Sequence, residues 1–140
     1  CMAEGLQNDG VLYTIDINKE LVPFAQKYFN KSSYKNLIKM MVGNALEIIP
    51  KLNFKWDLVF IDADKENYSN YFDSVIEKVN KGGMIIADNV LWSGKVTKPT
   101  SKNDIETNAL KTFNVKVHSD SRVRNVLMPV RDGMMIMIKK

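Results

Sequence analysis

The chain has 140 residues, of which 45% are hydrophobic and 26% charged, and its net charge is +4. This composition excludes a disordered chain, and no apolar run reaches the roughly 20 residues that cross a bilayer. The single cysteine, Cys1, excludes an intramolecular disulfide and a thiolate metal cluster. Nothing at the start of the chain is typical of a signal peptide, so we expect a cytoplasmic protein without a membrane partner. The lysines are spread along the chain without an arginine-rich block, so we expect no nucleic-acid partner.

Strand-like and helix-like stretches alternate along the first half of the chain. β-branched and aromatic residues predict a strand at 11–16, and apolar residues at three- and four-residue spacing predict a helix at 21–28. The stretch at 56–62 contains an unbroken apolar run at 58–61, which predicts a strand covered on both faces. Between these elements we expect a strand at 39–43 and a short helix at 45–52.

The second half begins with the clearest helical stripe, which runs from Tyr68 to Val79. Gly82 and Gly83 are predicted to end that helix with a left-handed cap. The remaining expected elements are strands at 84–88, 115–118, 123–130 and 134–138, a loop at 93–103, a helix at 105–113 and a hairpin turn at 131–133.

Repeated strand and helix units predict an α/β fold: a Rossmann-like, doubly wound and mainly parallel sheet with helices on both faces and a C-terminal antiparallel hairpin. Such a domain normally opens with a strand and a glycine-rich cofactor loop. Residues 1–6 instead look like the last turn of a helix capped by Gly5. We therefore expect residues 1–140 to be the C-terminal portion of a single domain that lacks its first strand and glycine loop.

Polar side chains follow three of the predicted strands. Asp16 ends the first, Asp62 ends the strand at 56–62 with Asp64 two residues later, and Asp88 ends the strand at 84–88 with Asn89 next to it. Because the carboxyl ends of parallel strands meet at one edge of a sheet, these side chains are predicted to converge there.

Asp16 suits the two hydroxyls of a ribose, as acidic residues do after the second strand of nucleotide-binding folds. The alternative is that Asp16 or Asn18 caps the helix that follows. Dinucleotide-binding and S-adenosylmethionine-binding proteins share this acidic residue, so Asp16 does not separate the two.

Asp62, Asp88 and Asn89 offer hard oxygen ligands that suit Mg²⁺ or Ca²⁺. The alternative is that they cap helices and turns. Lys65 lies three residues after Asp62 and is a candidate general base, because nearby positive charge favours loss of its proton. The alternative for Lys65 is a solvated surface lysine.

Three segments together resemble the cation-dependent O-methyltransferases, which include catechol and caffeoyl-coenzyme A O-methyltransferases. The segments are residues 60–68 (FIDADKENY), 87–96 (ADNVLWSGKV) and 129–133 (PVRDG). The similarity extends in order and spacing over essentially the entire chain and is closer to the caffeoyl-coenzyme A branch.

The resemblance implies methyl transfer from S-adenosylmethionine to a hydroxyl of a vicinal aromatic diol, which is catechol-like or hydroxycinnamoyl-coenzyme A-like. It implies a divalent cation, Mg²⁺ before Ca²⁺ or Mn²⁺, that positions this phenolic acceptor, and a homodimer. The implied roles are Asp62, Asp88 and Asn89 as metal ligands, Asp62 and Lys65 as catalytic residues, Asp16, Ala45 and Asp64 as cofactor contacts, and Trp92 and Ser93 as the acceptor pocket.

Two other functions stay open from the sequence. One is an NAD-dependent oxidoreductase of Rossmann type, which shares Asp16 but gives no reason for Asp62, Asp88 and Asn89 to converge. The other is a non-catalytic fragment that only packs with a partner. Because the glycine-rich loop is not expected in residues 1–140, we predict that these residues alone bind S-adenosylmethionine poorly.

Overall fold

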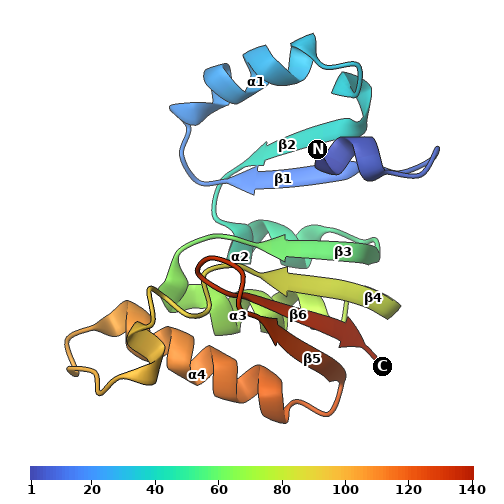
Figure 1. The fold of residues 1–140 in the computed structure, drawn as a ribbon. Coiled ribbons are helices and arrows are strands. Elements are labelled where there is room, and N and C mark those ends of the chain that lie inside the picture. The colour runs from blue at the N-terminus through green and yellow to red at the C-terminus, as the bar shows by residue number, and fades with distance from the viewer. The chain divides into compact units, whose positions relative to one another are not determined.

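The computed structural model covers residues 1–140 and divides into two compact units, residues 1–52 and 53–140 (Figure 1). None of its helices is long and apolar enough to span a membrane. The first unit contains β1 (Leu12–Asp16), α1 (Leu21–Lys31), β2 (Ile38–Val42) and α2 (Ala45–Ile48). The second contains β3 (Trp56–Ile61), α3 (Tyr68–Ile76), β4 (Val79–Ala87), α4 (Ile105–Ser119), β5 (Val123–Met128) and β6 (Met134–Lys139).

In residues 1–52, β1 and β2 pair in parallel, and α1 joins them. The predicted helical stripe of α1 forms, but Phe24 and Tyr28 are 63% and 53% exposed, with their ring centroids 4.9 Å apart. Strand β1 pairs with β2 alone. The apolar face of α1 and one edge of β1 are therefore uncovered within this unit.

The N-terminal segment is a 3-10 helix, Met2–Gly5, and not an α-helical turn capped by Gly5. Leu6 follows in an extended conformation, and Gly5 does not have a positive φ. A 3-10 helix has hydrogen bonds between residues three apart, whereas an α-helix has them between residues four apart. Here the Glu4 backbone N–H donates to the Cys1 carbonyl at 3.1 Å. The glycine signal was therefore misread.

The second unit holds a four-stranded sheet in the order β3-β4-β6-β5. Strands β3 and β4 are parallel, whereas β6 runs antiparallel to both β4 and β5. The predicted α/β class, with parallel strands and a C-terminal antiparallel hairpin, is confirmed. Because β3 and β4 are neighbours and parallel, their carboxyl ends lie at the same edge of the sheet.

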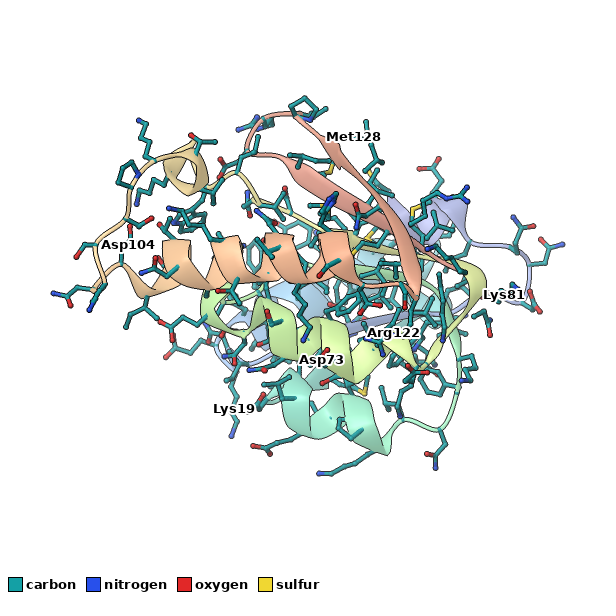
Figure 2. The ribbon with its side chains drawn as sticks, turned by 90° about the horizontal axis from the view of Figure 1, so that it is seen from below. Lys19, Asp73, Lys81, Asp104, Arg122 and Met128 are labelled. Carbon is teal, nitrogen blue, oxygen red and sulfur yellow. The ribbon has the colours of Figure 1, made fainter.

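Helices α3 and α4 pack against one another over one face of this sheet (Figure 2). Phe72 and Ile76 of α3, Phe113 of α4, Ile85 of β4 and Met137 of β6 are all 0% exposed. Leu58 and Phe60 point to the other face and are 48% and 43% exposed. The prediction that β3 is covered on both faces is therefore wrong for this chain, because α3 and α4 cover one face only.

The helix predicted to run to Val79 ends earlier. Helix α3 ends at Ile76, and Val79 begins β4, where it pairs with Trp56. Met84 pairs with Leu58, so the residues between Val79 and Met84 form an irregularity in the strand. Gly82 adopts a φ of +81° within it. The glycines permit this irregularity rather than capping the helix.

The strand predicted at 115–118 is the end of α4, which continues to Ser119. Leu110, Phe113 and Val117 follow one another at three- and four-residue spacing, and all three are 0% exposed. Burial of this stripe decides the conformation, because packing overrides the β preference of valine in so short a stretch.

Arg122 links the end of α3 to the end of α4. Its guanidinium bonds Glu77 at 2.8 Å and Asp120 at 2.7 Å, and these hydrogen bonds hold the pKa values of both carboxyls below their usual range. A carboxyl whose pKa is lowered in the folded state stabilises that state above its unfolded pKa of about 4. The stabilisation is lost as the pH falls through the lowered folded value.

We therefore expect the free energy of unfolding to fall below about pH 4, and Arg122→Gln to make this fall shallower. Urea denaturation at pH 7 and at pH 3 measures the difference. Arg124→Gln is the matched control, because Arg124 is an exposed arginine of β5 without an ion pair. An Arg122→Gln variant with the acid dependence of the wild type would contradict this role.

Candidate active site

The predicted polar residues of the second unit meet at the carboxyl ends of β3 and β4. Ile61 and Ala87, the last residues of the two strands, are partners in the parallel register. The backbone N–H of Asp88 then donates to the Ile61 carbonyl at 3.0 Å. This register places Asp62 and Asp88, each one residue beyond its strand, side by side at one sheet edge.

Lys65 connects two of the three predicted metal ligands. It lies in the 3-10 helix η4 (Lys65–Asn67), and it is buried at 7% exposure, so the alternative of a solvated surface lysine is wrong. Its Nζ donates to Asp62 Oδ1 at 3.2 Å and to Asn89 Oδ1 at 3.0 Å. The two oxygens thus face one positive charge.

Tyr68 also belongs to this site, although the sequence predicted only that it begins a helical stripe and ends the segment at 60–68. It is 0% exposed; its hydroxyl accepts from Lys65 Nζ at 2.5 Å and donates to the Asp88 carbonyl at 3.0 Å. Burial, together with the charges of Asp62 and Asp88, raises the pKa of Tyr68 far above that of a free tyrosine. The hydroxyl therefore stays protonated. Its position three residues after Lys65 on a helical turn was the available signal.

The turn after β4 orients Asn89. Its φ of +59° is left-handed, which asparagine tolerates better than most residues. Asp88 Oδ1 accepts the Asn89 backbone N–H at 2.7 Å, which fixes this turn. The Asp62 side chain is 53% exposed and reachable from solvent. Carboxylate and amide oxygens that already face one cationic group fit a divalent cation.

Asp64 is held by two side chains of the following turn and helix. Tyr71 donates its hydroxyl to Oδ1 at 2.5 Å, and Asn67 donates its amide to Oδ2. Burial alone would raise the pKa of Asp64, but these hydrogen bonds outweigh it and lower the pKa. Burial and the Asp64 carboxylate in turn raise the pKa of Tyr71. Asp64 is therefore a fixed negative charge.

Trp92 and Ser93 lie in the loop after β4, both with left-handed backbones. The Trp92 ring centroid is 5.7 Å from Lys65 Nζ and 5.9 Å from Lys95 Nζ, so the indole borders the lysine of the site. Its Nε1 is buried without a hydrogen-bond partner. Ser93 donates its backbone N–H to the Asp132 side chain, which ties the loop to the β5–β6 hairpin.

The hairpin turn supports this loop through Gly133. It has a φ of +81°, and an added Cβ would lie 2.5 Å from Cγ of Leu91. We expect Gly133→Ala to lower the free energy of unfolding by about 2–3 kcal/mol, through backbone strain plus the clash. Gly82→Ala is the matched control, because Gly82 has the same φ with no atom within 4 Å. Equal losses in urea denaturation would contradict the importance of the Leu91 contact.

Asp16 and Ala45 belong to the first unit. Asp16 ends β1, and its Oδ1 accepts the Asn18 backbone N–H at 2.8 Å. Asn18 in turn accepts from the Glu20 N–H at 2.9 Å, and neither side chain caps α1. The helix-cap alternative for Asp16 is therefore wrong, although its carboxylate does stabilise the turn. Ala45 begins α2 directly after its cap.

Comparisons with known proteins show which family the chain resembles. A family described as O-methyltransferase matches residues 1–140. A Dictyostelium discoideum protein named "Probable caffeoyl-CoA O-methyltransferase 2" is 30% identical over 142 residues, which cover 98% of this chain and 62% of that protein. The chain therefore spans about three fifths of the length of that relative.

Two solved structures have the same fold as this chain, and each of them contains SAM or SAH. The O-methyltransferase TomG from Streptomyces achromogenes, involved in tomaymycin synthesis and in complex with SAM, has a TM-score of 0.89 at 26% identity, over 99% of this chain and 66% of TomG. The Bacillus cereus O-methyltransferase in complex with SAH has a TM-score of 0.90 at 26% identity, over 99% of this chain and 67% of that protein. Since the family match includes every residue, the chain belongs to the O-methyltransferase family.

Proposed function

We propose that the protein transfers a methyl group from S-adenosylmethionine to a hydroxyl of a vicinal aromatic diol, with a divalent cation held by Asp62, Asp88 and Asn89. The observation that carries this proposal is the approach of Asp62 Oδ1 and Asn89 Oδ1 to the same Lys65 Nζ, at 3.2 and 3.0 Å. Two oxygens directed at one positive charge, beside a third candidate ligand, support a site for a divalent cation.

The cation, when bound, supplies positive charge that lowers the pKa of a coordinated hydroxyl. Asp62 and Asn89 direct their oxygens at one point, and Asp88 is kept beside them by the bond from the Asn89 backbone N–H. A vicinal diol suits such a site, because its two neighbouring oxygens fix the orientation of the ring.

Lys65 is the base nearest to these ligands. In the proposed reaction its Nζ, once neutral, accepts the proton of the acceptor hydroxyl. The acceptor oxygen then forms its bond to the methyl carbon as the bond from that carbon to sulfur breaks, and both electrons of that bond stay on sulfur. Alignment of the two reactants is the main contribution of the protein and can be worth roughly 7–11 kcal/mol.

The cofactor contacts are proposed at Asp16, Ala45 and Asp64. Asp16 is the last residue of the parallel strand β1 and suits the ribose hydroxyls, and Ala45 offers its backbone to the adenine. The Asp64 carboxylate stays ionised and suits the ammonium of the methionine part. Support comes from TomG, whose structure contains SAM.

The acceptor is proposed to lie against Trp92 and Ser93. The indole borders Lys65, and its buried N–H has no hydrogen-bond partner. A hydroxycinnamoyl-coenzyme A ester is one candidate, because the relative from Dictyostelium discoideum carries caffeoyl-CoA in its name. Lys95 adds positive charge beside the same ring.

Calorimetric titration of the full-length protein with S-adenosylmethionine and with NAD tests the cofactor, and Mn²⁺ binding followed by electron paramagnetic resonance tests the metal. We expect binding of S-adenosylmethionine and of one Mn²⁺ per chain, and none of NAD. Binding of NAD alone would overturn the proposal in favour of the oxidoreductase alternative. Absence of both cofactor and metal binding would favour the non-catalytic alternative.

A further inference from the structure

We propose that Tyr68 is a positioning residue of the methyl-transfer site, which holds the Lys65 ammonium and the Asp88–Asn89 turn in one hydrogen-bonded unit through its hydroxyl. This inference rests on the proposed function and assigns a role to a residue outside its metal, cofactor and acceptor sets. The hydroxyl accepts from Lys65 Nζ at 2.5 Å and donates to the Asp88 carbonyl at 3.0 Å.

The position of this hydroxyl is fixed by the core around it. Tyr68 is 0% exposed, and its ring packs edge-on against Phe113 of α4, with centroids 5.4 Å apart. Lys65 Nζ also lies 4.7 Å from the centroid of the Tyr68 ring. Because the Tyr68 ring is held by its helix and by a core neighbour, its hydroxyl has a fixed position. That position lies between η4 and the end of β4.

The hydroxyl restrains two groups that would otherwise move. Lysine has a long and flexible side chain, and Lys65 has three oxygen partners, one of which is Tyr68. The Asp88 carbonyl belongs to the turn in which Asn89 adopts its left-handed φ. Removal of the hydroxyl leaves this carbonyl without its tyrosine donor and leaves the lysine with two of its three oxygen partners, so we expect the ammonium to be held less firmly. Outer contacts of this kind tune metal sites by orienting the ligands.

Tyr68→Phe in the full-length protein removes the hydroxyl and keeps the ring. We expect kcat to fall by about 10- to 100-fold, with the KM for S-adenosylmethionine unchanged, because the loss affects alignment rather than cofactor binding. Phe72→Leu is the packing control, because Phe72 is a buried aromatic residue of the same helix whose ring contact is with Phe113 and not with Tyr68. The control should lower the melting temperature and leave kcat within a few-fold of the wild type. Tyr68→Phe should lower kcat by far more.

A double-mutant cycle with Lys65→Met separates positioning from packing. If Tyr68 acts through Lys65, Tyr68→Phe costs much less in the Lys65→Met background than in the wild type. Equal costs in both backgrounds, or a Tyr68→Phe variant with wild-type kcat, would overturn the inference.

A spectroscopic readout keeps this test independent of the proposed function. In the wild type we expect the buried Lys65 ammonium to give a ¹H–¹⁵N signal that is protected from exchange with water, and we expect Tyr68→Phe to abolish it. A signal that persists in Tyr68→Phe would show that the hydroxyl does not hold the lysine. If the wild type shows the protected signal but no methyl transfer, the proposed function fails while the lysine contact stands.

Discussion

Replacing Asp88 with alanine should abolish cation-dependent methyl transfer in the full-length protein. The stabilisation that a bound cation gives to developing charge is worth several kcal/mol, so we expect a loss on the order of 10³ in kcat/KM. Initial rates at saturating Mg²⁺ measure this loss. Mn²⁺ binding should weaken in the same variant, because one of the three ligands is gone.

Asp88→Asn separates the charge from the fold. Asparagine keeps an oxygen that can accept the Asn89 backbone N–H, a bond of 2.7 Å in the structure. The turn is therefore retained while the negative charge is lost. Asp57→Ala removes an exposed aspartate of β3 away from the site and serves as the control. Folded Asp88 variants with wild-type, chelator-sensitive turnover would show that this carboxylate is not a ligand.

Lys65→Met should lower kcat by about 10²- to 10⁴-fold, the range typical of a lost general base. Methionine keeps the apolar stem in its buried place and removes the ammonium. The Mn²⁺ affinity should not fall, because Asp62 and Asn89 then lose the lysine that contacts their oxygens. This combination of slow turnover and retained metal binding distinguishes Lys65 from the three ligands.

Lys65→Arg tests whether charge alone suffices. Arginine keeps the positive charge but does not lose its proton at physiological pH, so it should be as inactive as methionine. Lys81→Met, on the irregular and exposed start of β4, is the control for loss of a surface lysine. If Lys65→Arg turned over at the wild-type rate, the lysine would act by charge and not as a base.

The strands that carry the site could be predicted because their sequence signal is local. Residues 58–61 and 84–87 are continuous apolar runs closed by aspartates, and parallel pairing brings the two ends together. The convergence of Asp62 and Asn89 followed from this topology and needed no knowledge of the loops.

Other features depended on contacts that a linear pattern does not contain. The C-terminal turns of α4 are rich in valine and lysine, and only the burial of Val117 beside Phe113 makes them helical. Gly82 and Gly83 are typical of a helix end. They lie within β4 because Val79 pairs with Trp56 and so begins the strand before them. In both places a tertiary contact decides the conformation.

The site itself was incomplete for the same reason. Tyr68 fits the apolar stripe of α3, and this stripe accounts for its aromatic ring. The stripe does not predict a contact for its hydroxyl. Only the fold shows that this hydroxyl meets Lys65 and the Asp88 carbonyl. The partners of Asp64 were missed likewise, because Asn67 and Tyr71 become neighbours of this carboxylate only when the chain turns into η4 and α3.

The most direct test of the cation-positioned methyl transfer compares two acceptors that differ by one hydroxyl. Initial rates of methyl transfer from labelled S-adenosylmethionine are measured for a vicinal diol and for its monohydroxy analogue, with Mg²⁺ and with a chelator. We predict that the full-length protein methylates the diol only with Mg²⁺ and that the rate recovers when the cation is restored. Methylation of the monohydroxy analogue should be slow with Mg²⁺ and with the chelator. Equal rates on the two acceptors, or full activity in the chelator, would contradict the account.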